Sequence, residues 1–367
     1  MRFPEFSGEW NKYTINDLAT VVGGGTPDTT VKSYWGGDIQ WFTPSEIGKN
    51  KYVDFSKRTI TRDGLDNSSA KLLPLHTILL SSRATVGECS IASNECTTNQ
   101  GFQSLIAKQC NIDFLYYLIQ TKKKDLIRNA CGSTFLEISA NEIRKIKVAV
   151  PVQNEQEQIA KLLSLIDERI ATQNKIIEDL KKLKSAIRKK IFSLLKDEYT
   201  KSFEINQLLD YEQPTAYIVA NDEYSTDTRL TPVLTANKGF ILGYTDEKNG
   251  IYQKGACIIF DDFTMDAKYV SFPFKVKSSA IKILTAKPNV NLRFMFEYLS
   301  YWELKSEEHK RHYISEISPL VIELPSKEKQ NIIALLMTSL NNKLTIEEKA
   351  KIRYEVQKGY LLSQMFI

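Results

Sequence analysis

The chain has 367 residues, of which 42% are hydrophobic and 25% charged, and its formal net charge is +5. This length and composition are typical of a soluble globular protein with two or more domains, and the small basic excess permits a nucleic-acid partner without requiring one. The N-terminal MRFPEFSGEW has no apolar run, and no stretch of the chain approaches the about 18 apolar residues of a membrane span. We therefore expect neither secretion nor membrane insertion.

The cysteines indicate a reducing compartment. They are odd in number and form no C-x-x-C pair: Cys89, Cys96, Cys110, Cys131 and Cys257. Free, buried thiols in a cytoplasmic protein are the natural interpretation.

The first segment, residues 1–150, is predicted to be a loop-rich α+β domain. A turn-rich loop covers 22–29, a strand covers 38–42, and two strands joined by a short turn cover 77–83 and 87–92. A helix is predicted over 113–129, followed by an alternating strand over 141–150.

Polar side chains in this segment are candidate DNA contacts. Cations suit phosphates, and an amide suits a base edge, which selects Lys32, Gln40, Arg83, Lys122, Lys123 and Lys124. The alternative for Arg83 is an ion pair inside the domain, with Glu88 or Asp38.

Residues 151–196 are predicted to form a long helix. Read with period 7, apolar residues line one seam that is interrupted only by Gln173. The packing residues on this helix are Ile159, Leu163, Ile166, Ile170, Ile177, Leu180 and Ile187.

The second segment, residues 197–324, repeats the edges of the first around different contents. Phe203 begins a motif that matches the one at Tyr13, and Ser315 begins one that matches the motif at Asn141. Aromatic and amide side chains alternate with lysines, which again suits phosphates and base edges. The candidate DNA contacts are Asn237, Lys238, Lys248 and Lys268.

Residues 325–367 repeat the first helix without a gap, with Pro325 on Pro151 and Phe366 on Phe192. Its packing residues are Ile333, Leu340, Leu344, Tyr354 and Leu361. We expect the two helices, each roughly 60 Å long, to pack antiparallel as a coiled-coil spacer. In the alternative, each is an ordinary surface helix on its own domain.

Catalytic motifs are missing from the sequence. It has neither the Pro-Pro dipeptide of an amino-methyltransferase target site nor a G-x-x-x-x-G-K-[ST] phosphate loop. Pro27-Asp28 has no acidic partner at the spacing of a restriction nuclease. His309 and His312 are better explained as a solvent-exposed pair than as metal ligands.

Several motifs resemble one known family. GGGTPDTTVKSYWGGDIQWFTPSEI (23–47), ILLSSRATVGECSIA (78–92) and TNQGF (98–102), with PVQNEQEQIAKLLSLID after them, are similar to the specificity (S) subunit of type I restriction-modification systems. PVLTANKGFILGYT (232–245) and the stretch 257–284 extend the resemblance over essentially the whole chain. The second helix departs more from the family pattern.

The resemblance implies two target recognition domains, 1–150 and 197–324, and two conserved spacer helices, 151–196 and 325–367, related by a pseudo-twofold repeat. It implies a non-catalytic protein that binds a bipartite, asymmetric DNA target, two methyltransferase subunits and a restriction/motor subunit in the cytoplasm. S-adenosylmethionine, ATP and Mg²⁺ would belong to the partner subunits. Two alternatives stay open: a coiled-coil adaptor that recognises proteins, and a self-contained enzyme.

Overall fold

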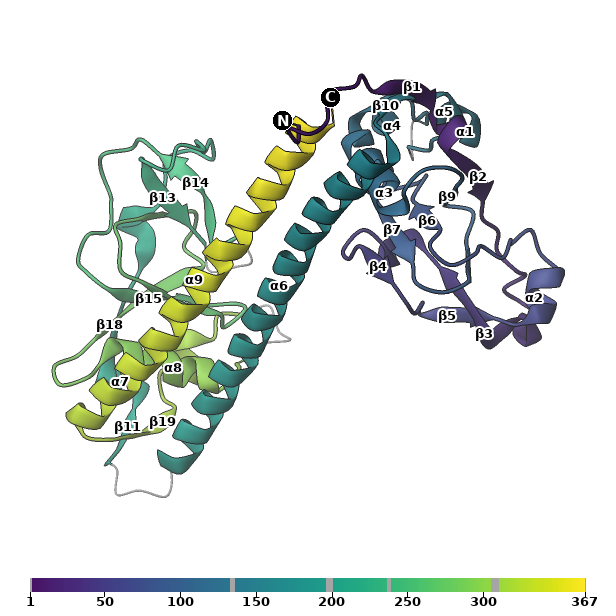
Figure 1. Cartoon of the computed structure of the whole chain (residues 1–367). Coiled ribbons are helices and arrows are strands. Elements are labelled where there is room, and N and C mark those ends of the chain that lie inside the picture. The colour runs from purple at the N-terminus through teal and green to yellow at the C-terminus, as the bar shows by residue number, and fades with distance from the viewer. Residues whose placement is uncertain (1, 133–135, 196–200, 236–238, 305–309, 367) are drawn as a thin grey trace. The chain divides into compact units, whose positions relative to one another are not determined.

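The computed structural model of the protein describes residues 2–132, 136–195, 201–235, 239–304 and 310–366. The chain divides into two compact units: unit 1 consists of residues 1–174 and 349–367, and unit 2 of residues 175–348. The two longest helices, α6 (Gln153–Leu195) and α9 (Lys327–Met365), each contribute one part to each unit (Figure 1).

Unit 1 is a mixed α/β fold. Its antiparallel pair joins β1 (Asn11–Thr14) to β10 (Lys147–Val150), and its larger sheet has the order β2-β9-β6-β7-β4, with bounds Ala19–Gly23, Gln103–Ala107, Ile78–Leu80, Cys89–Ala92 and Tyr52–Val53. A second sheet has the order β5-β3-β8, with bounds Arg58–Ile60, Trp35–Phe42 and Cys96–Thr98. The short helices are α1 (Ile15–Leu18), α2 (Arg62–Asp66), α3 (Ile112–Thr121), α4 (Lys123–Arg128) and α5 (Ala140–Lys145).

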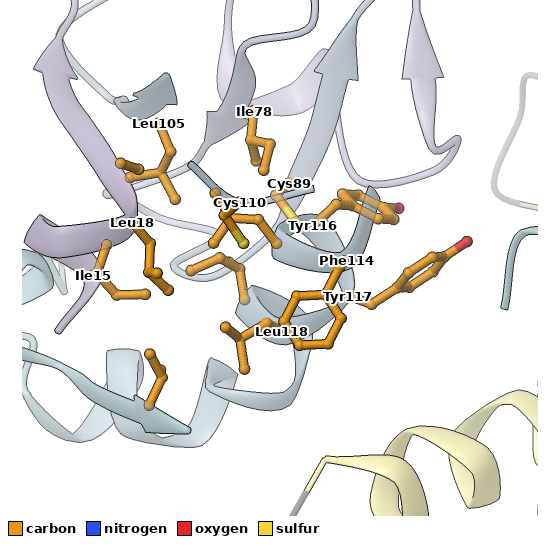
Figure 2. Close-up of a cluster of buried hydrophobic side chains, with 14 of the residues drawn as sticks. Ile15, Leu18, Ile78, Cys89, Leu105, Cys110, Phe114, Tyr116, Tyr117 and Leu118 are labelled. Atoms are coloured by element: carbon orange, nitrogen blue, oxygen red, sulfur yellow. The ribbon is translucent and has the colours of Figure 1, made fainter. Parts of the chain in front are cut away.

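The main core of unit 1 lies between the five-stranded sheet, α3 and the long helices. Asn111 caps α3 by accepting the Phe114 N–H at 3.0 Å, which directs the apolar residues of α3 inward. Figure 2 shows Phe114, Tyr117 and Leu118 of α3 beside Ile78, Cys89 and Leu105 of the sheet. Residues of α6 and α9 complete this core: Ile159, Ala160, Leu163, Ile166, Leu361 and Met365.

Unit 2 repeats this plan with different sheets. Its edge pair joins β11 (Lys201–Glu204) to β19 (Val321–Leu324), and its four-stranded sheet has the order β12-β18-β15-β16, with bounds Leu209–Glu212, Ile281–Ala286, Cys257–Asp261 and Ala267–Val270. A three-stranded sheet has the order β14-β13-β17, with bounds Ile241–Thr245, Thr231–Leu234 and Lys275–Val276. The helices are α7 (Ile205–Leu208) and α8 (Leu292–Tyr301), and a π-helical turn covers Tyr313–Ile317.

The long helices run antiparallel within each unit. In unit 1, Lys358 of α9 pairs with Asp167 of α6 at 2.7 Å, while Phe366 packs against Phe114 at the start of α3. In unit 2, Lys184 of α6 donates to Asn341 of α9 at 2.5 Å. Lys184 and Asn341 are the repeat equivalents of Lys358 and Asp167, so one polar contact between the helices occurs twice.

The predicted packing residues of both helices are all buried or half-buried. Of the twelve, six are buried, namely Ile159, Leu163, Ile166, Ile177, Ile333 and Leu361. The other six are half-buried: Ile170, Leu180, Ile187, Leu340, Leu344 and Tyr354. Gln173, the polar residue in the seam, is buried.

Some local predictions were wrong. The helix expected over 113–129 is divided at Lys122 into α3 and α4, and the strand expected over 141–150 begins instead as α5, whose cap is the Ser139 hydroxyl. Cys131 is exposed, whereas the other cysteines are buried. His312 was expected to be exposed, but it is only 2% exposed, because the π-helical turn places it against Asp262. His309 lies outside the described residues.

No helix in the described ranges has the length and apolar character of a membrane span.

Candidate nucleic-acid interface

Two tryptophans of β3 pack together in unit 1, where Trp35 is half-buried and Trp41 is buried. The rings of Trp35 and Trp41 meet edge to face at 5.0 Å. A register shift in the pairing of β3 with β5 lies between Trp35 and Ile39, and a Cβ on Gly37 would lie 2.6 Å from the Ile60 carbonyl oxygen, so the bulge needs glycine there. The guanidinium of Arg58 lies over Trp35, 3.6 Å from the ring centre.

Gln40 holds the adjoining loop in place. Its side-chain oxygen accepts the backbone N–H of Ser56 at 2.7 Å, and the Ser56 hydroxyl accepts the backbone N–H of Trp41 at 2.9 Å. Gln40 is half-buried. Because its carbonyl oxygen is engaged inside the protein, only its amide N–H groups remain for the base contact that the sequence suggested.

The predicted cations Arg83 and Lys123 both pair with carboxylates of their own unit. Arg83 contacts Glu137 at 2.7 Å, neither of the two partners named from the sequence. Lys123 pairs with Glu88, which lies in the same turn as Arg83. The structure therefore places these two cations near one another, although 40 residues of sequence separate them.

The remaining candidates for DNA contact differ in exposure and lie in different segments of the chain. Lys32 and Lys124 are exposed and Lys122 is half-buried at the junction of α3 and α4. In unit 2, Lys248 is exposed and Lys268 is half-buried in β16. Asn237 and Lys238 lie outside the described residues.

Sequence reasoning missed Phe55, in the loop between β4 and β5, and Arg58, the first residue of β5. Phe55 is 82% exposed, the highest value among the large hydrophobic residues of the described chain. The signal was present in the stretch DFSKR, where an aromatic residue stands among polar neighbours just before two cations.

A cavity of about 730 Å³ opens in unit 1 where α3 meets the long helices. Lys51, 8% exposed in its side chain, pairs with Asp113 at 2.7 Å and donates to Ser164 at 2.6 Å. Tyr117 donates to Asp167 at 2.7 Å, and burial followed by the nearby carboxylate raises the pKa of that phenol. These contacts pair Lys51 with Asp113 and Tyr117 with Asp167, so the cavity is a polar junction between α3 and the long helices.

The equivalent junction in unit 2 is centred on Glu297, which is fully buried. Arg188 donates to it at 2.7 Å, and the Asn341 amide donates to it at 3.3 Å. Burial lowers the pKa of the neighbouring Lys184. Glu297 lies at the position of α8 that corresponds to Tyr117 in α3. The position is therefore repeated, while its side chain changes from a phenol to a carboxylate.

The described residues contain no group of three or more histidine, cysteine, aspartate or glutamate side chains arranged to hold a metal ion.

A model of the type I restriction modification DNA specificity domain matches residues 7–182 and 197–356. The chain belongs to this DNA specificity family. The two matched ranges are the two halves of the repeat, each with a globular part and most of one long helix.

Two curated specificity subunits are each similar to about half of the chain. The specificity subunit of type I restriction enzyme MjaIX from Methanocaldococcus jannaschii is 36% identical over 58% of this chain and 50% of its own length. The EcoR124I/EcoR124II specificity subunit from Escherichia coli is 39% identical over 43% of each chain. The chain thus spans about half the length of each of these two relatives.

One solved structure has the same fold over the whole chain. The S subunit of a type I restriction-modification system from M. genitalium superposes with a TM-score of 0.64 and 17% identity, covering 100% of this chain and 99% of that one. This likeness extends to both globular parts and both long helices.

Proposed function

We propose that this chain is the DNA-reading, non-catalytic specificity subunit of a type I restriction-modification complex. Residues 1–150 and 197–324 are the two target recognition domains, and residues 151–196 and 325–367 are the helices that connect them. Each domain reads one half of a bipartite, asymmetric site.

The observation that carries this proposal is a repeated frame around unequal contents. The contact between Lys358 and Asp167 recurs between Lys184 and Asn341, and the edge pair β1–β10 recurs as β11–β19. Among the described residues, the sheets inside the frame differ, with five and three strands in unit 1 but four and three in unit 2. A repeated frame presents both domains to DNA in similar poses, while different loops read different bases.

The helices supply docking surfaces for partner subunits. On α9, Ile352, Val356 and Tyr360 follow one another at intervals of four residues and are 57%, 68% and 53% exposed. We define these three residues as the outer stripe of α9. Such a stripe suits an amphipathic helix of a partner, here one of two methyltransferase subunits.

Catalysis belongs to the partners in this proposal. The methyltransferase subunits would hold S-adenosylmethionine, and the restriction/motor subunit would hold ATP and Mg²⁺. The complex would act on DNA in the cytoplasm.

The test is co-expression of the chain with type I modification subunits, followed by mapping of methylated sites across the genome. We expect one motif with two unrelated halves separated by an unread spacer. A continuous motif or a perfect palindrome would contradict the proposal that the two domains read two different half-sites. A protein-binding adaptor would instead show no salt-dependent DNA affinity, and a self-contained enzyme would methylate or cleave DNA as the isolated chain.

A further inference from the structure

Loop 54–58, which comprises the residues between β4 and β5 together with Arg58 at the start of β5, is fixed from several sides. Lys57 donates its backbone N–H to Glu46 at 2.6 Å, and the Ser56 hydroxyl donates to the Arg58 carbonyl at 2.6 Å. On the other side, the Asn94 amide donates to the Asp54 carbonyl at 3.3 Å. Together with the bond from Ser56 to Gln40, these contacts hold both flanks of Phe55, so its exposure is not the result of a loose loop.

Phe55 stands at the tip of this loop with 82% of its surface exposed. A single exposed apolar residue is ordinary on a protein surface. An aromatic ring held out by a rigid loop is different, because it gives up little conformational entropy when it inserts into a partner. Its exposure also means that it contributes little to the folding of its own unit.

Arg58, three residues after Phe55, is held in an arrangement suited to an anion. Its guanidinium is 3.6 Å from the Trp35 ring centre and 5.4 Å from that of Trp41. Within the described residues this guanidinium makes no hydrogen bond or ion pair with another side chain. Stacking therefore orients the group and leaves its N–H donors available. Lys57 adds a second exposed cation, while Asp54 is the one carboxylate inside the loop.

From this geometry we infer that loop 54–58 is a DNA wedge, in which Phe55 enters a base step and Arg58 binds a phosphate flanking that step. An apolar side chain that partly unstacks one step, flanked by cations that hold the backbone, is a known way for proteins to deform a duplex. The inference rests on the proposed function, since it takes double-stranded DNA as the ligand. It assigns Gln40 to positioning the loop.

The probe is a duplex selected from a random-sequence library by the wild-type chain assembled with its modification subunits. 2-Aminopurine placed at successive positions reports unstacking by its fluorescence. We expect the wild-type complex to raise the fluorescence at one step. Phe55→Ala removes this rise and weakens binding about tenfold, with an unchanged salt dependence, while Phe55→Trp keeps both properties. Leu75→Ala, which removes another exposed apolar side chain of unit 1, is the matched control.

Arg58→Ala should weaken binding and lower the slope of log K against log salt by about one phosphate. Equal affinity and equal fluorescence for wild type and Phe55→Ala would overturn the wedge, and an unchanged slope for Arg58→Ala would overturn the phosphate contact. Failure of the wild-type complex to select any sequence, with no salt-dependent binding, would overturn the proposed function instead. Thermal melting of each variant separates loss of folding from loss of binding.

Discussion

The side-chain oxygen of Gln156 accepts the backbone N–H of Asn111 at 3.0 Å, while its amide donates to the Pro151 carbonyl at 2.9 Å. One buried side chain thus ties the start of α6 to the cap of α3. Gln330 repeats the arrangement in unit 2, where it accepts the Asn291 N–H at 2.9 Å and donates to Pro325 at 3.0 Å.

Gln156→Ala should destabilise the protein because it leaves the Asn111 N–H and the Pro151 carbonyl without partners in a buried place. The expected loss is about 1 to 3 kcal/mol in the free energy of unfolding, measured by chemical denaturation. Gln158→Ala, at an exposed position on the same helix, is the control. Equal stability of the two variants would show that water replaces the lost contacts.

The Glu247–Lys275 pair predicts a pH effect in unit 2. Lys275, 4% exposed in its side chain, contacts Glu247 at 2.7 Å and donates to the Asn249 carbonyl. The hydrogen bond from Lys275, with one from the Ala220 N–H, lowers the pKa of Glu247 below its ordinary 4.5. A carboxylate with a lowered folded pKa stabilises the fold fully above its ordinary pKa, and this contribution is lost as the pH falls through the lowered value.

At about pH 7, Glu247→Gln should therefore lower the free energy of unfolding by about 1 to 3 kcal/mol relative to wild type. At about pH 2, the difference in free energy of unfolding between the variant and wild type should be smaller. Urea unfolding at both pH values measures this difference. Asp246→Asn, at the exposed neighbouring position, should change neither value appreciably. A difference from wild type that is the same at both pH values would mean that Glu247 does not titrate with folding.

Arg83 can be tested against its own partner. If it binds a phosphate, Arg83→Ala weakens DNA binding and lowers the salt slope by about one. Glu137→Gln, which releases Arg83 from its ion pair, should then leave binding unchanged or strengthen it. Both side chains are more than a third exposed, so neither change should cost more than about 1 kcal/mol of stability. Early melting of Arg83→Ala with an unchanged salt slope would establish a purely structural pair.

The outer stripe of α9 can be exchanged for the sequence of α6. The repeat equivalents of Ile352 and Val356 are Glu178 and Lys182, which form an exposed ion pair at 2.7 Å. The double variant Ile352→Glu/Val356→Lys should keep its stability, because the new pair is spaced for the helix surface. It should lose affinity for a methyltransferase subunit, as titration calorimetry would show. Unchanged affinity would place docking elsewhere.

The sequence predicted the parts of this fold that depend on periodicity. Gap-free repetition and an apolar stripe were enough to identify two long helices, since Ile159 and Ile333 need no distant residue to define their side of the helix. The role of Gln156 was not predictable in this way. Its alignment with Gln330 was visible, but its hydrogen-bond partner at Asn111 is defined only by the tertiary fold.

The candidate interface was harder to predict, because its side-chain contacts are also defined only by the tertiary fold. Arg83 was selected as a phosphate contact, which stays a prediction, and its ion-pair partner Glu137 is distant in sequence and was not among the two candidates. Gln40 was selected by residue type alone, and its carbonyl oxygen is already used by Ser56. Phe55 was overlooked because an apolar residue between polar ones is usually buried, and burial is not encoded locally.

The division of unit 1 between two distant parts of the chain determines when it can be completed during synthesis. Unit 2 is a single continuous segment, so it is whole once residue 348 has left the ribosome. Unit 1 is translated first but must wait for Lys358 to reach Asp167 and for Phe366 to reach Phe114 and Trp10. Domains usually fold in the order of their synthesis. Here the first unit exposes the apolar side of its part of α6 until residues 349–366 have been made, so the unit that begins first is completed after unit 2.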